Sequence, residues 1–188
     1  MQAANPLKTP SIRFLGPLDL GSVREEILAI PQAEWDSENA GKPNRNYGAL
    51  DEAQHIVFRF ISNVNDWRQH YDRPMWEKWR GRLEPLMRRA VEPYGYANGT
   101  FSRVLLAKMP PGGRIHPHID ANPAARWPLK IHIPIQTNDQ VSFYIGETPY
   151  HLEVGQAYEV NNLGMHAVAN LGDTQRIHLI FEYYDDVR

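Results

Sequence analysis

The stretch Leu129-Lys130-Ile131-His132-Ile133-Pro134-Ile135 alternates between aliphatic residues and residues of other kinds. This period of two predicts a β-strand over residues 129–137 that buries one face. Further strands are predicted at residues 101–109, 141–145, 156–160, 166–170 and 175–184. Turn signals such as Asn138-Asp139 and Gly172-Asp173 separate several of them. Many short strands joined by tight turns indicate a sandwich or jelly roll, and we expect a double-stranded β-helix.

The first half of the chain carries the helix signals. The motif Ser22-Val23-Arg24-Glu25 has the form of a capping box, which predicts a helix that starts there and that Pro31 ends. The residues that follow, 32–45, are mostly polar, and we expect them to form a loop.

Two more elements are expected before residue 100. Residues 55–61 are apolar and β-branched enough for a strand. In residues 74–91 apolar side chains recur every three or four positions, which predicts an amphipathic helix kinked or split at Pro85. The fold class is therefore mainly β with flanking α. We expect one domain of 188 residues, with N-terminal helices in a mixed part at 1–99 packed on one face of a β-helix core mainly at 100–185.

Composition excludes several classes of partner. The chain has 20 basic and 22 acidic residues, so nothing indicates a nucleic-acid partner. No apolar stretch approaches the ~20 residues of a membrane span, and residues 1–10 lack the apolar part of a signal peptide. We expect a cytoplasmic protein that acts on a small molecule or a peptide. With eight His and no Cys, a transition-metal site must use His, Asp and Glu, which suit iron, manganese or zinc.

The segment His116-Pro117-His118-Ile119-Asp120 contains a His-x-Asp pair, and His166 follows far downstream. On a strand His118 and Asp120 point the same way, and a jelly roll brings distant strands side by side. Two His and one carboxylate form the facial triad that holds ferrous iron and leaves positions open for a cosubstrate and O2. Because a His-x-Asp pair alone is common, it is the distal His and a later Arg that indicate His118, Asp120 and His166 as catalytic metal ligands.

A cosubstrate such as 2-oxoglutarate is a dianion, and its burial requires cationic partners. Arg176 follows His166, and its planar guanidinium matches a carboxylate. Alternation places Arg176 with His178 on the non-apolar face of one strand, and Lys130 with His132 on that of another. We expect Arg176, Lys130 and His132 to bind the cosubstrate, and His178 to be a satisfied polar residue.

His116 leaves an alternative open. Alternation puts it on the same strand face as His118, and a site of His116, His118 and His166 would resemble a cupin. The second cupin motif is partly matched in spacing, by Gly155, His166 and Asn170. The Glu of the first cupin motif is absent, so we favour His116 as a supporting residue. A cupin-like isomerase or dioxygenase that needs no 2-oxoglutarate, and a non-catalytic binding module, are the competing hypotheses.

The loop at residues 121–128 follows the His-x-Asp pair. Trp127 and this loop either cover the site as a lid or pack on the rim of the barrel. Asn122 and Arg126 are candidates for contact with a substrate carboxylate or amide.

Residues 105–184 resemble the aspartyl/asparaginyl β-hydroxylase family of 2-oxoglutarate oxygenases. The matching pieces are Pro111-Gly112, His116-Pro117-His118, residues 130–135, Val154-Gly155-Gln156, residues 161–170 and Arg176-Ile177-His178-Leu179. The resemblance implies a double-stranded β-helix that binds Fe(II) through His118, Asp120 and His166. It also implies that 2-oxoglutarate binds with its distal carboxylate on Arg176 and its other end near Lys130 and His132. The expected reaction is hydroxylation of an amino acid, a derived metabolite or a peptidyl Asp/Asn-type residue, with release of succinate and CO2.

Overall fold

The computed structural model describes residues 4–43, 48–50 and 52–187, whose strands form two sheets. The strands of the large sheet are β1 (Ile12–Pro17), β2 (Gln54–Ile61), β3 (His70–Asp72), β4 (Gly99–Met109), β6 (Leu129–Gln136), β9 (Gln156–Val160) and β11 (Arg176–Asp185). Those of the small sheet are β5 (Arg114–His118), β7 (Val141–Ile145), β8 (Thr148–Tyr150) and β10 (His166–Asn170). Within the described part of the chain the orders are β1-β9-β6-β11-β4-β2-β3 and β5-β10-β7-β8, with antiparallel pairing throughout.

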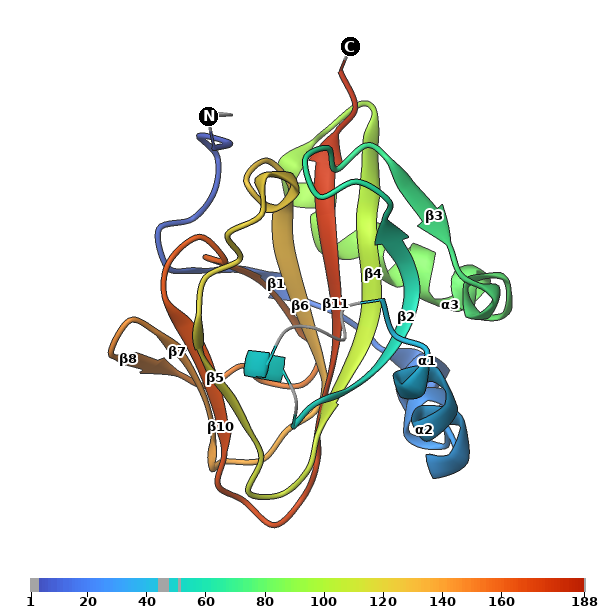
Figure 1. Cartoon of the computed structure of the whole chain (residues 1–188), viewed down its shortest axis with the longest axis vertical. Helices are drawn as coiled ribbons and strands as arrows, with labels where there is room; N and C mark the ends of the chain where they lie inside the picture. The colour runs from blue at the N-terminus through green and yellow to red at the C-terminus, as the bar shows by residue number, and fades with distance from the viewer. Residues whose placement is uncertain (1–3, 44–47, 51, 188) are drawn as a thin grey trace.

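The small sheet faces one side of the large sheet, and the helices lie against its other side (Figure 1). The helices are α1 (Gly21–Leu28), α2 (Gln32–Ala40) and α3 (Pro74–Val91), with 3-10 turns at Gly48–Leu50, Glu92–Tyr94 and Pro123–Ala125. The main apolar core joins the helices to the large sheet through residues such as Phe58, Leu83 and Leu106. A second cluster, which includes Phe143 and Val168, lies between the sheets. The expected double-stranded β-helix with flanking helices is confirmed.

The central strands β6 and β11 carry different chemistry on their two faces. Ile131 and Leu179 are fully buried in the core on the helix side. Lys130, His132 and Arg176 point the other way and line the space between the sheets. The predicted alternation is therefore confirmed, and it encloses the polar side chains of these strands inside the barrel.

The loop predicted for residues 32–45 is wrong over most of its length, because α2 occupies residues 32–40. The helix follows directly after Pro31, and its buried residue Trp35 is 2% exposed. The ammonium of Lys108 lies 4.3 Å from the centroid of the Trp35 ring. One anchored tryptophan stabilises a helix whose other residues are mostly polar, because tertiary packing rather than propensity carries short helices. Residues 44 and 45 lie outside the described residues.

The other two helices differ from the predictions only in detail. α1 begins at Gly21 with no side-chain cap, so the predicted capping box is wrong. The Ser22 hydroxyl instead donates to Oε1 of Glu26 at 3.1 Å, one turn further on. α1 ends before Pro31 as predicted, and α3 covers residues 74–91 without a break at Pro85.

Four strands that the sequence patterns do not delimit, β1, β3, β5 and β8, all lie at sheet edges. Edge strands are short and half exposed, so the alternation that identifies central strands is weak in them. β1, β2 and β3 come from the N-terminal part of the chain and belong to the large sheet. The N-terminal half therefore contributes to the β core as well as to the helical layer.

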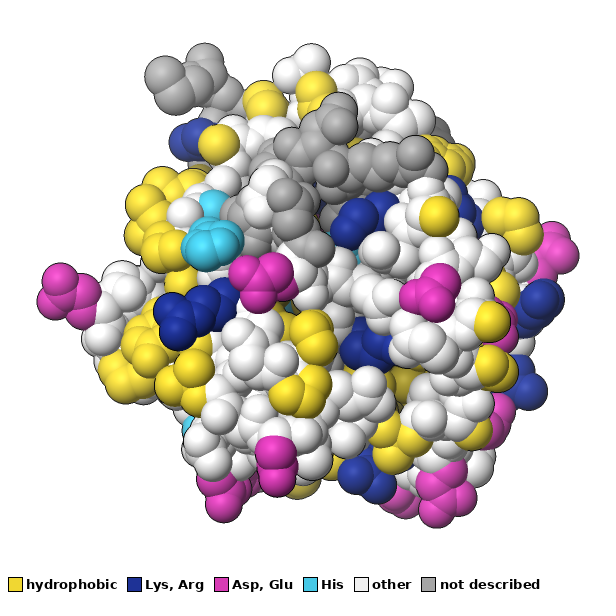
Figure 2. All heavy atoms as spheres, turned by 60° about the horizontal axis from the view of Figure 1, so that its bottom comes forward, with side chains coloured by type: hydrophobic (Ala, Val, Ile, Leu, Met, Phe, Trp, Pro, Cys, Tyr) yellow, Lys and Arg dark blue, Asp and Glu magenta, His cyan; other side chains and the backbone are white. Residues whose placement is uncertain are grey.

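The surface mixes side chains of all kinds. On the face shown in Figure 2, acidic and basic side chains are interspersed, with hydrophobic ones between them. The exposed large hydrophobic residues include Phe14, Met165 and Leu171. In the described ranges, no helix is both long and apolar enough to cross a membrane.

Leu83→Ala should lower the free energy of unfolding by roughly 2–5 kcal/mol, because the side chain is fully buried between α3 and the large sheet. Leu171→Ala is the matched control: it removes the same atoms from a side chain that is 58% exposed. The control should change the free energy of unfolding by less than about 0.5 kcal/mol. Urea denaturation followed by circular dichroism measures both. Equal shifts would contradict this placement of the core.

Candidate active site

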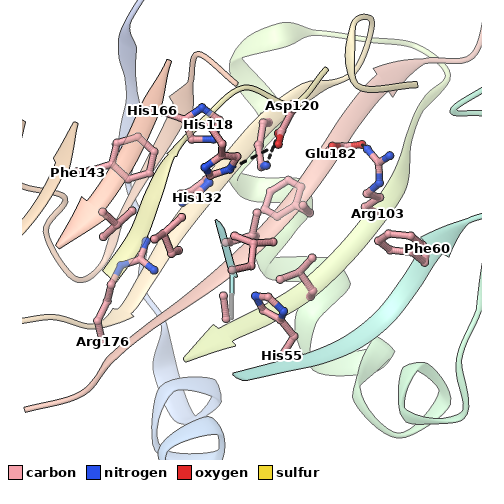
Figure 3. Close-up of a pocket in the computed structure, with 18 of the residues that line it drawn as sticks. His55, Phe60, Arg103, His118, Asp120, His132, Phe143, His166, Arg176 and Glu182 are labelled. Carbon is pink, nitrogen blue, oxygen red and sulfur yellow. Dashed lines mark hydrogen bonds and ion pairs between the residues drawn. The ribbon is translucent and has the colours of Figure 1, made fainter. Parts of the chain in front are cut away.

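A cavity opens between the two sheets, and side chains from both of them line it (Figure 3). Its polar lining residues are His55, Arg103, His118, Asp120, Asn122, Lys130, His132, His166, Arg176 and Glu182. Its apolar lining includes Ile115, Phe143 and Val168. The cavity therefore brings polar groups from several strands together in one concave site, which is typical of a ligand-binding site.

His118, Asp120 and His166 place one ligand atom each within 4.8 Å of one another. His118 ends β5 and His166 begins β10, and the two residues are direct partners in the ladder. Their ring centroids lie 4.2 Å apart, and Nε2 of His118 is 3.9 Å from Oδ1 of Asp120. The structure thus brings together the three residues that the sequence nominates as metal ligands.

Backbone carbonyls orient both imidazoles. Nδ1 of His118 lies 2.8 Å from the carbonyl oxygen of His116, and Nδ1 of His166 lies 3.0 Å from that of Gly164. A carbonyl only accepts hydrogen bonds, so each Nδ1 carries a proton, and in the neutral tautomer with this proton the lone pair lies on Nε2. Burial and the charge of Lys130 lower the pKa of His166 to about 4. His166 is therefore neutral at physiological pH, as a metal ligand must be.

Asp120 is held as a carboxylate. Burial opposes its ionisation, but Lys130 and the neighbouring histidines outweigh this effect and hold its pKa well below the usual range. Nζ of Lys130 donates to Oδ2 of Asp120 at 2.5 Å, which leaves Oδ1 on the side of His118. The Asp120 backbone N–H donates to the carbonyl oxygen of Asn162 at 3.0 Å. Two imidazoles and one carboxylate fit a divalent first-row metal such as iron.

A β-bulge turns His116 away from this cluster. His118 pairs with His166, but Ile115 rather than His116 pairs with Val168, so β5 holds one extra residue. Pro117, within the bulge, has no N–H to give to a ladder. The His116 side chain is 63% exposed, with Nε2 3.7 Å from Oε1 of Glu52. The expectation that His116 and His118 share a strand face is wrong, because the bulge shifts the alternation between them.

At one end of the cavity lies a fully buried cation, Arg176. Its Nη2 donates to Nδ1 of His178 at 2.9 Å, and His178 in turn lies 3.4 Å from His132, Nδ1 to Nδ1. Nε and Nη1 of Arg176 have no hydrogen-bond partner among the described residues, nor does Nε2 of either histidine. Burial lowers the pKa of Arg176 to about 9 and the pKa values of both histidines well below normal. A buried charged Arg bonded to a neutral histidine, with donors left unpaired among the described residues, fits an anionic ligand.

A second charged pair, Arg103 and Glu182, lies elsewhere in the cavity lining, and the sequence predictions missed it. Nη1 of Arg103 donates to Oε2 of Glu182, and Nη2 donates to Oδ1 of Asn122 at 3.2 Å. The sequence did contain a signal for Glu182, because alternation along the strand places it on the same face as Arg176 and His178. The ladder of β4 and β11, which sets Arg103 opposite Glu182, was not available from the sequence.

Of the three residues predicted to meet substrate, only Asn122 lines the cavity. Trp127 stacks on Trp67 instead, with ring centroids 5.9 Å apart and an interplanar angle of 11°. Arg126 also lies outside the lining, and its carbonyl accepts a bond from the Asn5 backbone at 3.1 Å. Between a lid and rim packing, this geometry favours rim packing for Trp127.

The N-terminal segment forms hydrogen bonds to the same loop. Nδ2 of Asn5 donates to the carbonyl oxygen of Trp127 at 3.0 Å. Nζ of Lys8 donates to the carbonyl oxygen of Pro128 and, at 2.8 Å, to Oδ1 of Asn162. The side chain of Asn162 also donates to Ala125, at 3.3 Å. The loop that begins at the metal carboxylate is thus tied at several points.

The chain matches the sequence profile of one protein family, and its fold is similar to those of solved structures. The sequence profile of the aspartyl/asparaginyl β-hydroxylase family matches residues 20–185. The fold is similar to a 2OG-Fe(II) oxygenase family oxidoreductase from Burkholderia pseudomallei (13% identity, TM-score 0.57, 98% of this chain and 97% of that chain). It is also similar to the collagen prolyl hydroxylase of Paramecium Bursaria Chlorella virus-1, solved with 2-oxoglutarate (10% identity, TM-score 0.56, 92% and 95%). A search of curated proteins gave no significant match.

Asp120→Ala and His166→Ala should each weaken Fe(II) binding by more than about 100-fold, because each removes one of three converging ligand atoms. His116→Ala is the matched control and should keep the affinity, because its imidazole points outward and its carbonyl remains. Anaerobic calorimetric titration with Fe(II) measures all three. Binding that survives in Asp120→Ala and disappears in His116→Ala would indicate a cupin-like ligand set instead.

Proposed function

The chain belongs to the aspartyl/asparaginyl β-hydroxylase family of 2-oxoglutarate-dependent oxygenases, and we propose that it hydroxylates an amino acid, an amino-acid-derived metabolite or a peptidyl Asp/Asn-type residue. One observation carries the proposal: a His-Asp-His cluster and a buried, incompletely bonded arginine share one cavity. The overall reaction consumes substrate, 2-oxoglutarate and O2. One oxygen atom enters the substrate as a hydroxyl group and the other enters succinate, while the 2-oxo acid loses CO2.

In this proposal Fe(II) binds to Nε2 of His118, Nε2 of His166 and Oδ1 of Asp120. The carbonyl contacts at each Nδ1 support this assignment, because they leave the Nε2 lone pairs free for a metal. Lys130 occupies the other carboxylate oxygen and keeps Asp120 ionised. Bound iron and 2-oxoglutarate together supply the oxidising chemistry, and the residues of the chain supply position and surroundings.

The 2-oxoglutarate site in this proposal is the Arg176 end of the cavity. Nε and Nη1 of Arg176 donate to the distal carboxylate, while His178 holds Nη2 and so fixes the guanidinium. His132 lies between this end and the metal ligands in Figure 3, which suits contact with the 2-oxo acid end. Lys130 acts indirectly, through Asp120.

Apolar side chains surround the reacting centre. The Phe143 ring lies parallel to His166, with centroids 6.2 Å apart, and meets His132 edge-on at 5.5 Å. Ile115 and Val168 line the same wall. A wall of this kind keeps water from the metal face and strengthens the electrostatic interactions inside the cavity.

The competing cupin-like function requires His116 at the metal. Its side chain lies on the outer face, beside Glu52, so no contact in the site favours that function.

Arg176→Met should weaken 2-oxoglutarate binding by roughly 100-fold or more, because it removes charge-assisted hydrogen bonds in a buried site. The matched control Arg114→Met changes an exposed arginine of β5 and should leave the affinity unchanged. The visible charge-transfer band of the anaerobic Fe(II)–2-oxoglutarate complex, titrated with 2-oxoglutarate, measures both. A wild-type titration curve for Arg176→Met would refute the assignment, and no band in the wild type would refute the function.

A further inference from the structure

The ion pair of Arg103 and Glu182 is separate from the residues to which the proposed function assigns iron and 2-oxoglutarate. Arg103 lies on β4 directly opposite Glu182 on β11, and their side chains are paired across the ladder. In Figure 3 the pair lies on the far side of Asp120 from Arg176. The metal ligands therefore stand between two charged ends of one cavity.

Stability gives no reason for this pair. Arg103 is 8% exposed and Glu182 is 3% exposed, so both charges are taken out of water. Replacing a buried ion pair by apolar residues of similar volume is often neutral or stabilising. The neighbouring lining residues Leu105 and Ile180 are apolar, so the site could accommodate such residues. A costly charged pair in a cavity wall is better explained by a ligand that uses it.

Two connections join the pair to the metal carboxylate. Arg103 donates to the side chain of Asn122, two residues after Asp120. Glu182 is the ladder partner of Lys130, whose ammonium holds Asp120. A small ligand on Arg103 and Glu182 therefore has its next atoms beside the metal ligands, where a substrate carbon belongs.

We propose that Arg103 and Glu182 bind the head group of a free α-amino acid, with Arg103 on its carboxylate and Glu182 on its ammonium group. The inference rests on the proposed oxygenase function and narrows its substrate class. A guanidinium donates paired hydrogen bonds to a carboxylate, and a carboxylate accepts them from an ammonium. A zwitterion brings one charge of each sign, so the balance of the pair is kept.

The contacts around the pair suit this role. Asn122 and the Phe60 ring, whose centroid is 5.4 Å from Cζ, fix the guanidinium of Arg103. The hydroxyl of Ser102 donates to Oε2 of Glu182 at 3.1 Å and orients the carboxylate. An amino acid within a peptide has neither charge on its backbone, so it cannot satisfy both groups.

The first test compares free and blocked ligands. Each proteinogenic L-amino acid is titrated by anaerobic calorimetry into wild-type protein loaded with Fe(II) and 2-oxoglutarate, and succinate release is then measured with O2. We expect at least one free amino acid to bind and to stimulate release. Its N-acetyl and amide forms should bind roughly 10- to 100-fold more weakly. Equal binding of blocked forms, or no binding by any free amino acid, overturns the subsite. Either result leaves the charge-transfer band, and with it the oxygenase function, intact.

The second test changes the pair itself. Arg103→Met, Glu182→Gln and the double variant Arg103→Met/Glu182→Leu should lose amino-acid affinity roughly 10-fold or more and keep the Fe(II)–2-oxoglutarate band. The double variant leaves no unpaired charge, so it stays testable if a single variant does not fold. Arg59→Met is the matched control, because Arg59 pairs with Asp72 outside the cavity. Wild-type amino-acid affinity in the folded double variant overturns the proposal.

Discussion

The alternation of side chains along β6 and β11 is the constraint on which the site depends. Successive residues of a strand face opposite ways, so the aliphatic residues that fill the helix-side core also fix the direction of Lys130, His132 and Arg176. A register slip of one residue would move these polar groups into the core. The packing of Ile131 and Leu179 against the helices therefore sets the chemistry of the opposite face.

Some charged side chains in the cavity have a partner of opposite charge, and one has none in the part of the chain that the structure describes. Asp120 is paired with Lys130, and Glu182 with Arg103. Arg176 has no acidic partner among the described residues and is bonded only to a neutral imidazole. In the free protein this unpaired buried charge lowers the free energy of unfolding, and pairing with an anionic ligand removes that penalty. If the cosubstrate binds at Arg176 as proposed, its binding is coupled to the stability of the fold.

Prediction from the sequence succeeded for elements whose apolar residues repeat with a regular period. It failed where a single tertiary contact or a local irregularity determines the structure. Central strands and α3 repeat their pattern often enough to be recognised, and residue types with their spacing were enough to nominate His118, Asp120 and His166. α2 was missed because Trp35 is its one buried residue in the described structure, so its sequence shows no apolar repeat. The direction of His116 was wrong because counting alternate residues assumes an unbroken strand, which the bulge at Pro117 is not. Arg103 and Glu182 are far apart in sequence, and only the register of β4 and β11 makes them a pair.

The ties from Asn5 and Lys8 to the loop around the metal carboxylate also bear on the order of folding. They span 122 residues to Trp127 and 154 residues to Asn162. During synthesis Asn5 and Lys8 leave the ribosome long before the residues to which they bond. Contacts of such long range form late in folding, because the entropy of closing the chain opposes them. Asp120, whose backbone bonds to Asn162, receives its final support only after distant parts of the chain have met. The ability to hold a metal should thus be among the last properties that the folding chain acquires.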